Sequence, residues 1–220
     1  MNYLSHYYFD QHDERPHYIL GLILPDLIRT FNRERVHKQK VEIHWQKPIQ
    51  NLQEGINKHH HIDELFHSST FFKSHNKRVF QQLQDVKFEG VTKYTHFVSH
   101  VLIEMLLDRF LMQENEQLAS TFYYKLNSTE KRNLVAYFNQ FPAVKDNFED
   151  FWKFIRRFCN SQFLIDYQER EGIVNRLNRV MQRITHQAFT PKDQVKLYGF
   201  VGEVEADLKL VYREIFEELK

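Results

Sequence analysis

The sequence has few of the residues that interrupt helices: 6 glycines and 5 prolines among 220 residues. Both residue types destabilise the interior of a helix, so their scarcity favours long helices joined by short loops. No series of alternating apolar and polar residues predicts a sheet. We therefore predict an all-α fold with one helical domain over residues 1–220, in which residues 1–112 carry the motifs and residues 113–220 form structural helices.

The single cysteine, Cys159, excludes an intramolecular disulfide framework and a cysteine-rich zinc site. One cysteine fits a reducing compartment, and we expect a cytoplasmic protein. The first residues do not resemble a signal peptide, and no apolar run approaches the length of a membrane span. The formal net charge of +1 gives no indication of a nucleic-acid or membrane partner.

Histidine is abundant, with 13 residues, and several lie at helical spacing in a helix predicted over residues 49–69. Side chains four residues apart lie above one another on a helix. One such stripe consists of Gly55, His59, Asp63 and His67. Imidazole and carboxylate groups at this spacing are typical metal ligands, although a solvated helix face is the alternative.

A second stripe lies on an otherwise apolar helix predicted over residues 91–112. Its members are His96, His100, Glu104 and Asp108. Unpaired polar groups are costly to bury, so this stripe faces either water or polar partners. Helical bundles build metal sites from facing stripes of this kind, and we expect the two helices to face each other.

Pro25 is predicted to open a helix and to place Asp26 in its first turn. The carboxylate there either stabilises the helix N-terminus or acts as a ligand or base. The basic segment that follows, from Arg29 to Lys40, overlaps a loop predicted over residues 31–47. It is either solvated surface or a basic edge that meets an acidic partner.

Four segments, in this order, resemble the motifs of the acyl carrier protein phosphodiesterase family. They are MNYLSH ending at His6, LGLILPD ending at Asp26, GIxxHxxID from Gly55 to Asp63, and YTHF containing His96. The resemblance implies a helical fold similar to the HD-type metal phosphohydrolases. It also implies hydrolysis of the phosphodiester that joins 4′-phosphopantetheine to a serine of acyl carrier protein, with manganese as the metal and iron or zinc as alternatives.

Three positions depart from the family's motifs. His67 stands where the family has Asp in FTD, Thr95 where it has Asp in YDHFL, and His60 where it has Arg after the first His. His67 is itself a good ligand, so a metal site of altered character can remain. His100 or Glu104 could substitute for the carboxylate missing at Thr95.

The resemblance and the two stripes together predict one metal-dependent site. The predicted metal ligands are His6, Asp26, His59, Asp63, His67 and His100, and the predicted catalytic residues are Asp26, Asp63 and His96. A metal there would polarise a phosphoryl oxygen and lower the pKa of a bound water. Asp26 or Asp63 would take the proton of the water, and His96 or His100 would protonate the leaving oxygen.

Two further hypotheses remain open. The first is a helical scaffold or binding protein that kept the fold without the chemistry, which the changes at His67 and Thr95 favour. The second is an HD-like phosphohydrolase that acts on a small phosphoester and makes no use of the basic segment. If the protein is a phosphodiesterase of this kind, acyl carrier protein is its expected partner. The oligomeric state stays open, with a homodimer as one option.

Overall fold

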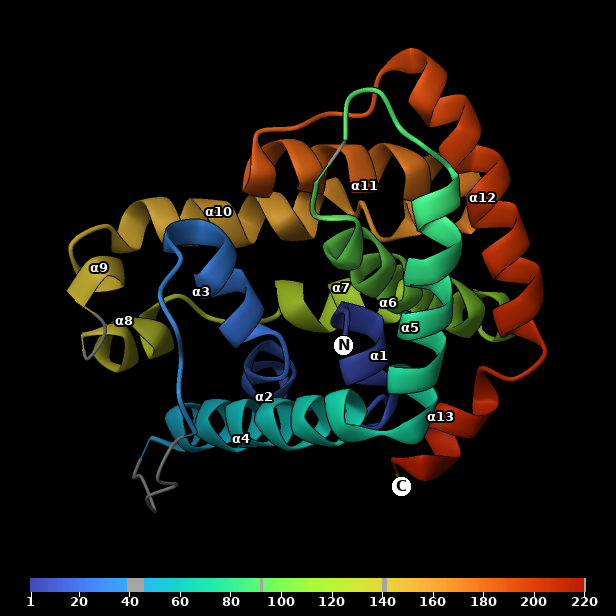
Figure 1. Cartoon of the computed structure of the whole chain (residues 1–220). Helices are drawn as coiled ribbons and strands as arrows, with labels where there is room; N and C mark the ends of the chain where they lie inside the picture. The colour runs from blue at the N-terminus through green and yellow to red at the C-terminus, as the bar shows by residue number, and fades with distance from the viewer. Residues whose placement is uncertain (39–45, 92, 140–141, 220) are drawn as a thin grey trace. The chain divides into compact units, whose positions relative to one another are not determined.

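The computed structural model describes residues 1–38, 46–91, 93–139 and 142–219 (Figure 1). These ranges contain helices and no strand, which confirms the predicted all-α fold. In chain order the elements are α1 (Tyr3–Tyr8), α2 (Pro16–Gly21), α3 (Leu24–Asn32), α4 (Lys47–Ser68), α5 (Thr70–Asp85), α6 (Thr95–Glu114), α7 (Leu118–Asn127), α8 (Arg132–Phe138), α9 (Pro142–Lys145), α10 (Phe148–Ser161), the 3₁₀ helix η1 (Ile165–Gln168), α11 (Arg170–Thr185), α12 (Pro191–Lys209) and α13 (Arg213–Glu218).

The helices α4 and α6 are the two that the histidine stripes predict. α4 ends at Ser68, and the Oγ of Ser69 accepts a hydrogen bond from the backbone N–H of Phe72 at the start of α5. A side-chain acceptor at this position satisfies one of the unpaired N–H groups of a helix terminus. The turn between α4 and α5 is thus closed by a local hydrogen bond.

The chain forms two compact units, and the first comprises residues 1, 3–64 and 116–163. Its core joins α1 to α7 and α10 through aromatic rings. The ring of Tyr7 lies 5.2 Å from that of Phe122, and the ring of Tyr3 meets Phe158 edge-on at 5.0 Å. Such pairs contribute about 0.5–1.5 kcal/mol beyond the area that they bury, and they hold α1 in place.

The second unit comprises residues 2, 65–115 and 164–220, and its central helix is α6. Arg109 of α6 is mostly buried and binds two other elements. Its Nε donates to Oε1 of Glu205 in α12 at 2.7 Å, and its Nη1 donates to the carbonyl of Tyr167 in η1 at 2.8 Å. A buried guanidinium is stable when its donors are paired in this way. The expectation of one domain over the whole chain stays a prediction.

In the first unit, α2 and α4 meet backbone to backbone at Gly21 and Gly55. A Cβ atom on Gly21 would lie 2.4 Å from the carbonyl oxygen of Leu52 and 2.9 Å from Cα of Gly55. A Cβ atom on Gly55 would lie 2.2 Å from the carbonyl oxygen of Tyr18. These separations are far below van der Waals contact, so both positions require glycine for this approach of the two helices.

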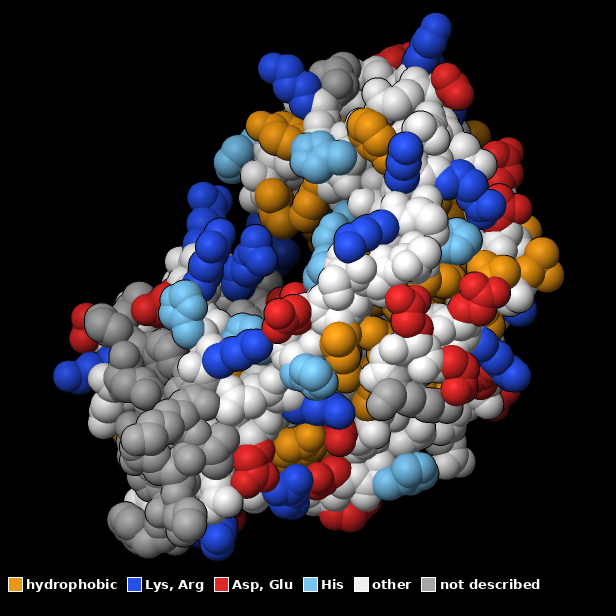
Figure 2. All heavy atoms as spheres, turned by 60° about the horizontal axis from the view of Figure 1, so that its bottom comes forward, with side chains coloured by type: hydrophobic (Ala, Val, Ile, Leu, Met, Phe, Trp, Pro, Cys, Tyr) orange, Lys and Arg blue, Asp and Glu red, His pale blue; other side chains and the backbone are white. Residues whose placement is uncertain are grey.

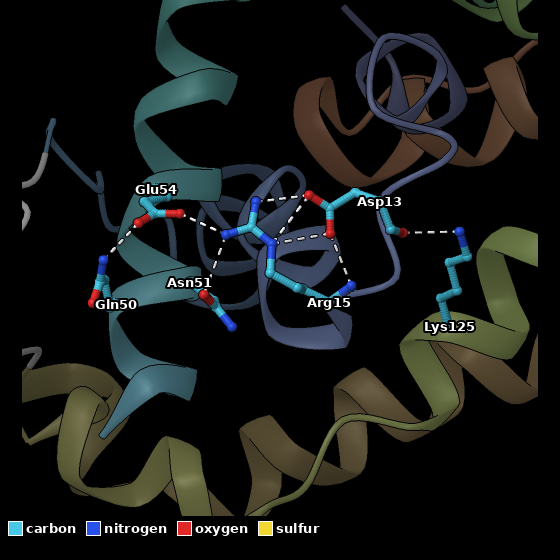
Figure 3. Close-up of polar contacts among 6 residues, drawn as sticks. All are labelled: Asp13, Arg15, Gln50, Asn51, Glu54 and Lys125. Atoms are coloured by element: carbon cyan, nitrogen blue, oxygen red, sulfur yellow. Dashed lines mark hydrogen bonds and ion pairs between the residues drawn. The ribbon is translucent and has the colours of Figure 1, made fainter. Parts of the chain in front are cut away.

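The segment between α1 and α2 is tied to α4 and α7 by charged side chains (Figure 3). Nη1 of Arg15 donates to Glu54 of α4 at 2.7 Å, and Nη2 donates to Asp13 at 2.7 Å. Nζ of Lys125 in α7 donates to the backbone carbonyl of Asp13 at 2.8 Å. Partial burial raises the pKa of Asp13 and Glu54, but their hydrogen bonds and the charge of Arg15 outweigh it and hold both below the ordinary range.

The glycine contact leads to a first prediction. Gly55→Ala should reduce the free energy of unfolding by about 1–3 kcal/mol, because α2 must move away from α4 to admit the methyl group. The matched control is Gly199→Ala in α12, where a Cβ would meet nothing within 4 Å. That change should instead stabilise the protein by about 0.5–1 kcal/mol, since alanine favours a helix interior. Denaturant unfolding of both variants measures the difference, and equal effects would contradict the account.

The network around Arg15 leads to a second prediction. Arg15→Ala should cost about 1 kcal/mol of unfolding free energy at pH 7, because the ion pairs are partly exposed to solvent. Asp13 and Glu54 have lowered pKa values in the folded protein. Their contribution is therefore present above the unfolded values of about 3.9–4.3 and is lost as the pH falls through the folded values.

The difference between the variant and the unchanged protein should consequently shrink between pH 7 and pH 3. Chemical denaturation at both pH values measures it. The control is Arg132→Ala, whose largely exposed guanidinium pairs locally with Glu130 and whose loss should have a smaller effect. A difference that is the same at both pH values would show that the charges of Arg15 are not the cause.

Candidate functional site

Three side chains with metal-ligand chemistry converge in the first unit: His6 of α1, Asp26 of α3 and His59 of α4. One ligand atom of each lies within 4.8 Å of the other two. His6 and His59 are 1% and 4% exposed, whereas Asp26 is half-buried. The two imidazole rings stack with their centroids 4.1 Å apart. Two imidazoles and a carboxylate form a donor set typical of first-row transition metals.

A backbone carbonyl sets the tautomer of His59. Its Nδ1 lies 2.8 Å from the carbonyl oxygen of Leu22, the residue that follows α2. A carbonyl oxygen only accepts hydrogen bonds, so Nδ1 carries the hydrogen and Nε2 keeps its lone pair. Metal-binding histidines usually have this arrangement, in which the second ring nitrogen donates to a carbonyl or carboxylate. Leu22 directly follows Gly21, so the glycine contact also positions this carbonyl.

Asp26 lies in the first turn of α3, which has Pro25 at its start as predicted. Its position there suits the partial positive charge of a helix N-terminus, and it also brings the carboxylate to His6 and His59. The two roles that the sequence left open are therefore compatible in the structure.

Asp63 lies one turn beyond His59 on α4, beside this group. Its Oδ1 accepts a hydrogen bond from the amino group of Met1 at 2.7 Å and lies 3.9 Å from Nε2 of His6. The carboxylate is about one-third exposed. It is thus close enough to His6 for electrostatic interaction, and it is open to solvent on one side.

A second group lies in the second unit and contains His67, at the end of α4, with His100 and Glu104 of α6. The Nε2 atoms of the two histidines are 3.1 Å apart, and Nε2 of His100 lies 3.0 Å from Oε1 of Glu104.

The predicted ligands lie in two such groups, one within each unit, and their sharing of one site stays a prediction. His6, Asp26 and His59 share the first, while His67 and His100 belong to the second. His96, predicted as a catalytic residue, is exposed at the start of α6 and belongs to neither group. Its proposed role, like those of the other site residues, stays a prediction.

Two contributors to these groups were missed or underrated from the sequence. Glu104, considered only as a substitute ligand, completes the second group, and its i, i+4 spacing from His100 was the available signal. The Leu22 carbonyl had no signal at all, because a backbone atom is not identified by residue type.

The basic segment after Asp26 is exposed where the structure describes it. Its exposed side chains are Arg29, Arg33, Arg35 and Lys38, while Lys40 lies outside the described residues. Lys38 pairs with Glu64 at 2.9 Å. Figure 2 shows Lys and Arg side chains gathered on one part of the face that it draws. Exposed basic side chains of this kind favour an acidic partner.

A family model described as acyl carrier protein phosphodiesterase matches residues 1–219. The chain belongs to this family. Membership extends the resemblance of residues 1–112 to the C-terminal helices, which carry none of the motifs. No curated protein and no solved structure matches the chain. Among the described residues, no helix has the length and apolar character needed to cross a membrane. The likeness to HD-type phosphohydrolases stays a prediction.

The contact between His59 and Leu22 leads to a third prediction. Long-range ¹H–¹⁵N correlation spectra of the metal-free protein at about pH 8 should show His59 with its hydrogen on Nδ1, because the carbonyl oxygen accepts it. The exposed His61 on the same helix serves as the control and should show the mixture of tautomers of a solvated imidazole. A hydrogen on Nε2 of His59 would contradict its assignment as an Nε2 ligand.

Proposed function

We propose that the protein hydrolyses a phosphodiester and that its substrate is the bond between 4′-phosphopantetheine and a serine of acyl carrier protein. Membership in the acyl carrier protein phosphodiesterase family supports this reaction. The single structural observation that carries it is the convergence of His6, Asp26 and His59. We also propose a cytoplasmic location, which the single cysteine favours.

The residues of the first group fit a transition metal. Imidazole and carboxylate donors suit manganese, iron or zinc, and the Leu22 carbonyl leaves the lone pair of His59 on Nε2. When bound, such a metal would polarise the phosphoryl group and lower the pKa of a bound water. His6, Asp26 and His59 would hold the metal. The burial of the two histidines would exclude bulk water from their side of the ion.

Asp63 is the candidate base of this reaction. Its carboxylate lies beside His6 and is partly exposed, so a water that approaches the group can transfer a proton to it. The oxygen of that water forms a bond to phosphorus, and the bond from phosphorus to the serine oxygen breaks. The serine oxygen must then gain a proton. His96 remains the proposed donor.

The basic segment is the proposed contact for acyl carrier protein, which we take to be acidic. Exposed charges at the edge of an interface mainly raise the rate of encounter and orient the partner. Arg29, Arg33 and Arg35 would thus act on the association rate, which should fall with rising salt concentration.

The fourth prediction tests the site by activity. With phosphopantetheine-bearing acyl carrier protein and manganese, mass spectrometry should show conversion to the unmodified carrier protein. Asp26→Asn and His59→Gln should each lower kcat by at least about 100-fold, the range expected for loss of a catalytic group. The control, His61→Ala, removes an exposed imidazole on the same helix and should keep full activity.

Two other outcomes correspond to the competing hypotheses. Binding of the carrier protein without conversion, in the presence of manganese, iron or zinc, would favour the scaffold. Hydrolysis of a small phosphodiester such as bis(p-nitrophenyl) phosphate, with no action on the carrier protein, would favour the small-substrate phosphohydrolase. Full activity in Asp26→Asn would refute the assignment of the site.

A further inference from the structure

Three polar side-chain atoms of the second unit lie in mutual contact: Nε2 of His67, Nε2 of His100 and Oε1 of Glu104. The two nitrogens are 3.1 Å apart, the carboxylate oxygen lies 3.0 Å from His100, and it lies 3.8 Å from His67. The trio therefore forms a small triangle, built from the last turn of α4 and two successive turns of α6.

The nitrogen Nε2 of His100 lies between the other two members of the trio. A neutral imidazole Nε2 carries one hydrogen or one lone pair, directed in the plane of the ring. Nε2 of His100 has two polar neighbours within 3.1 Å, an imidazole nitrogen and a carboxylate oxygen. The one hydrogen or lone pair of this nitrogen is therefore shared between two polar neighbours.

The same triangle has the dimensions of a metal-binding face. Atoms with these three separations lie on a circle of radius about 2 Å, and the bonds of zinc to histidine nitrogen and carboxylate oxygen are about 2.0–2.2 Å long. A point at bonding distance from all three atoms therefore exists just outside their plane. Two histidines and one carboxylate on one face, with the remaining positions open, are a recurrent arrangement for first-row metals.

We propose that His67, His100 and Glu104 bind a divalent first-row transition metal ion, which links the last turn of α4 to α6. Two nitrogen donors and one oxygen donor favour zinc, iron, cobalt or nickel over magnesium and calcium, which prefer oxygen ligands. None of these three ligands belongs to the group of His6, Asp26 and His59, and the proposal does not depend on the proposed hydrolysis.

Aromatic packing places the two imidazoles for this role. The ring of Phe72, in α5, is 5% exposed and meets His67 and His100 edge-on, with centroid distances of 5.2 and 4.9 Å. Glu104 lies four residues after His100, on the same face of α6. Ligands that are held in place by packing lose little conformational freedom when an ion binds.

The fifth prediction tests this site with the metal alone. Protein stripped with a chelator should bind zinc in equilibrium dialysis with excess magnesium present, and cobalt(II) should give visible absorption bands of a histidine-containing site. His67→Gln, His100→Gln and Glu104→Gln should each bind one ion fewer per chain, or bind it much more weakly. The loss of affinity should exceed the roughly 10- to 100-fold seen when a residue that only contacts a metal ligand is changed. Circular dichroism and thermal unfolding confirm that each variant folds.

Two further variants separate this site from the first group. Asp26→Asn should keep the ion at His67, His100 and Glu104. Its cobalt(II) spectrum should therefore still show the bands that His100→Gln loses. His96→Ala, which removes an exposed imidazole one turn earlier on α6, should leave the metal content unchanged. Because the readouts are metal content and spectrum, a protein that keeps this ion but hydrolyses no phosphodiester would refute the proposed function and not this site.

The result that overturns the proposal is equal zinc and cobalt binding by the unchanged protein and by folded His100→Gln. Absence of any binding by folded Asp26→Asn at millimolar zinc or cobalt would overturn it as well. The trio would then be a hydrogen-bonded pair of histidines with a carboxylate.

Discussion

The contact between Gly21 and Gly55 is the constraint on which the first unit's candidate site depends. With no side chain on either residue, α2 lies directly on the backbone of α4. This approach brings the carbonyl of Leu22 to Nδ1 of His59, and it places the start of α3, with Asp26, beside the same histidine. The close approach of α2 and α4 therefore affects the chemistry of the site, because the tautomer of His59 and the position of the Asp26 carboxylate both depend on it.

One helix contributes histidines to two distinct groups. α4 provides His59 to the group with His6 and Asp26, and it provides His67 to the group with His100 and Glu104. The histidine at position 67 departs from the family's motif, which has Asp there. It gives the second unit an imidazole that faces another imidazole and a carboxylate, which is a different chemical environment from that of the first group.

Family membership and side-chain geometry support the proposed reaction in different ways. The match over residues 1–219 defines the class to which the chain belongs, but it does not say which side chains act. The convergence of His6, Asp26 and His59 identifies a donor set that suits metal-dependent phosphodiester chemistry. The exposed arginines after Asp26 add a surface that suits an acidic partner, and they belong to the same unit as His6, Asp26 and His59.

The sequence by itself determined the all-α class, the two histidine-bearing helices and the helix start at Pro25, because prolines and the 3.6-residue period are local properties. It also pointed to His6, Asp26 and His59 through motifs in a fixed order. Only the tertiary structure decided that His67 meets His100 and Glu104, that His96 is exposed, and that the Leu22 carbonyl accepts a hydrogen bond from His59. A four-residue spacing shows which side chains share a face of one helix, but which side chains of other helices meet that face depends on packing.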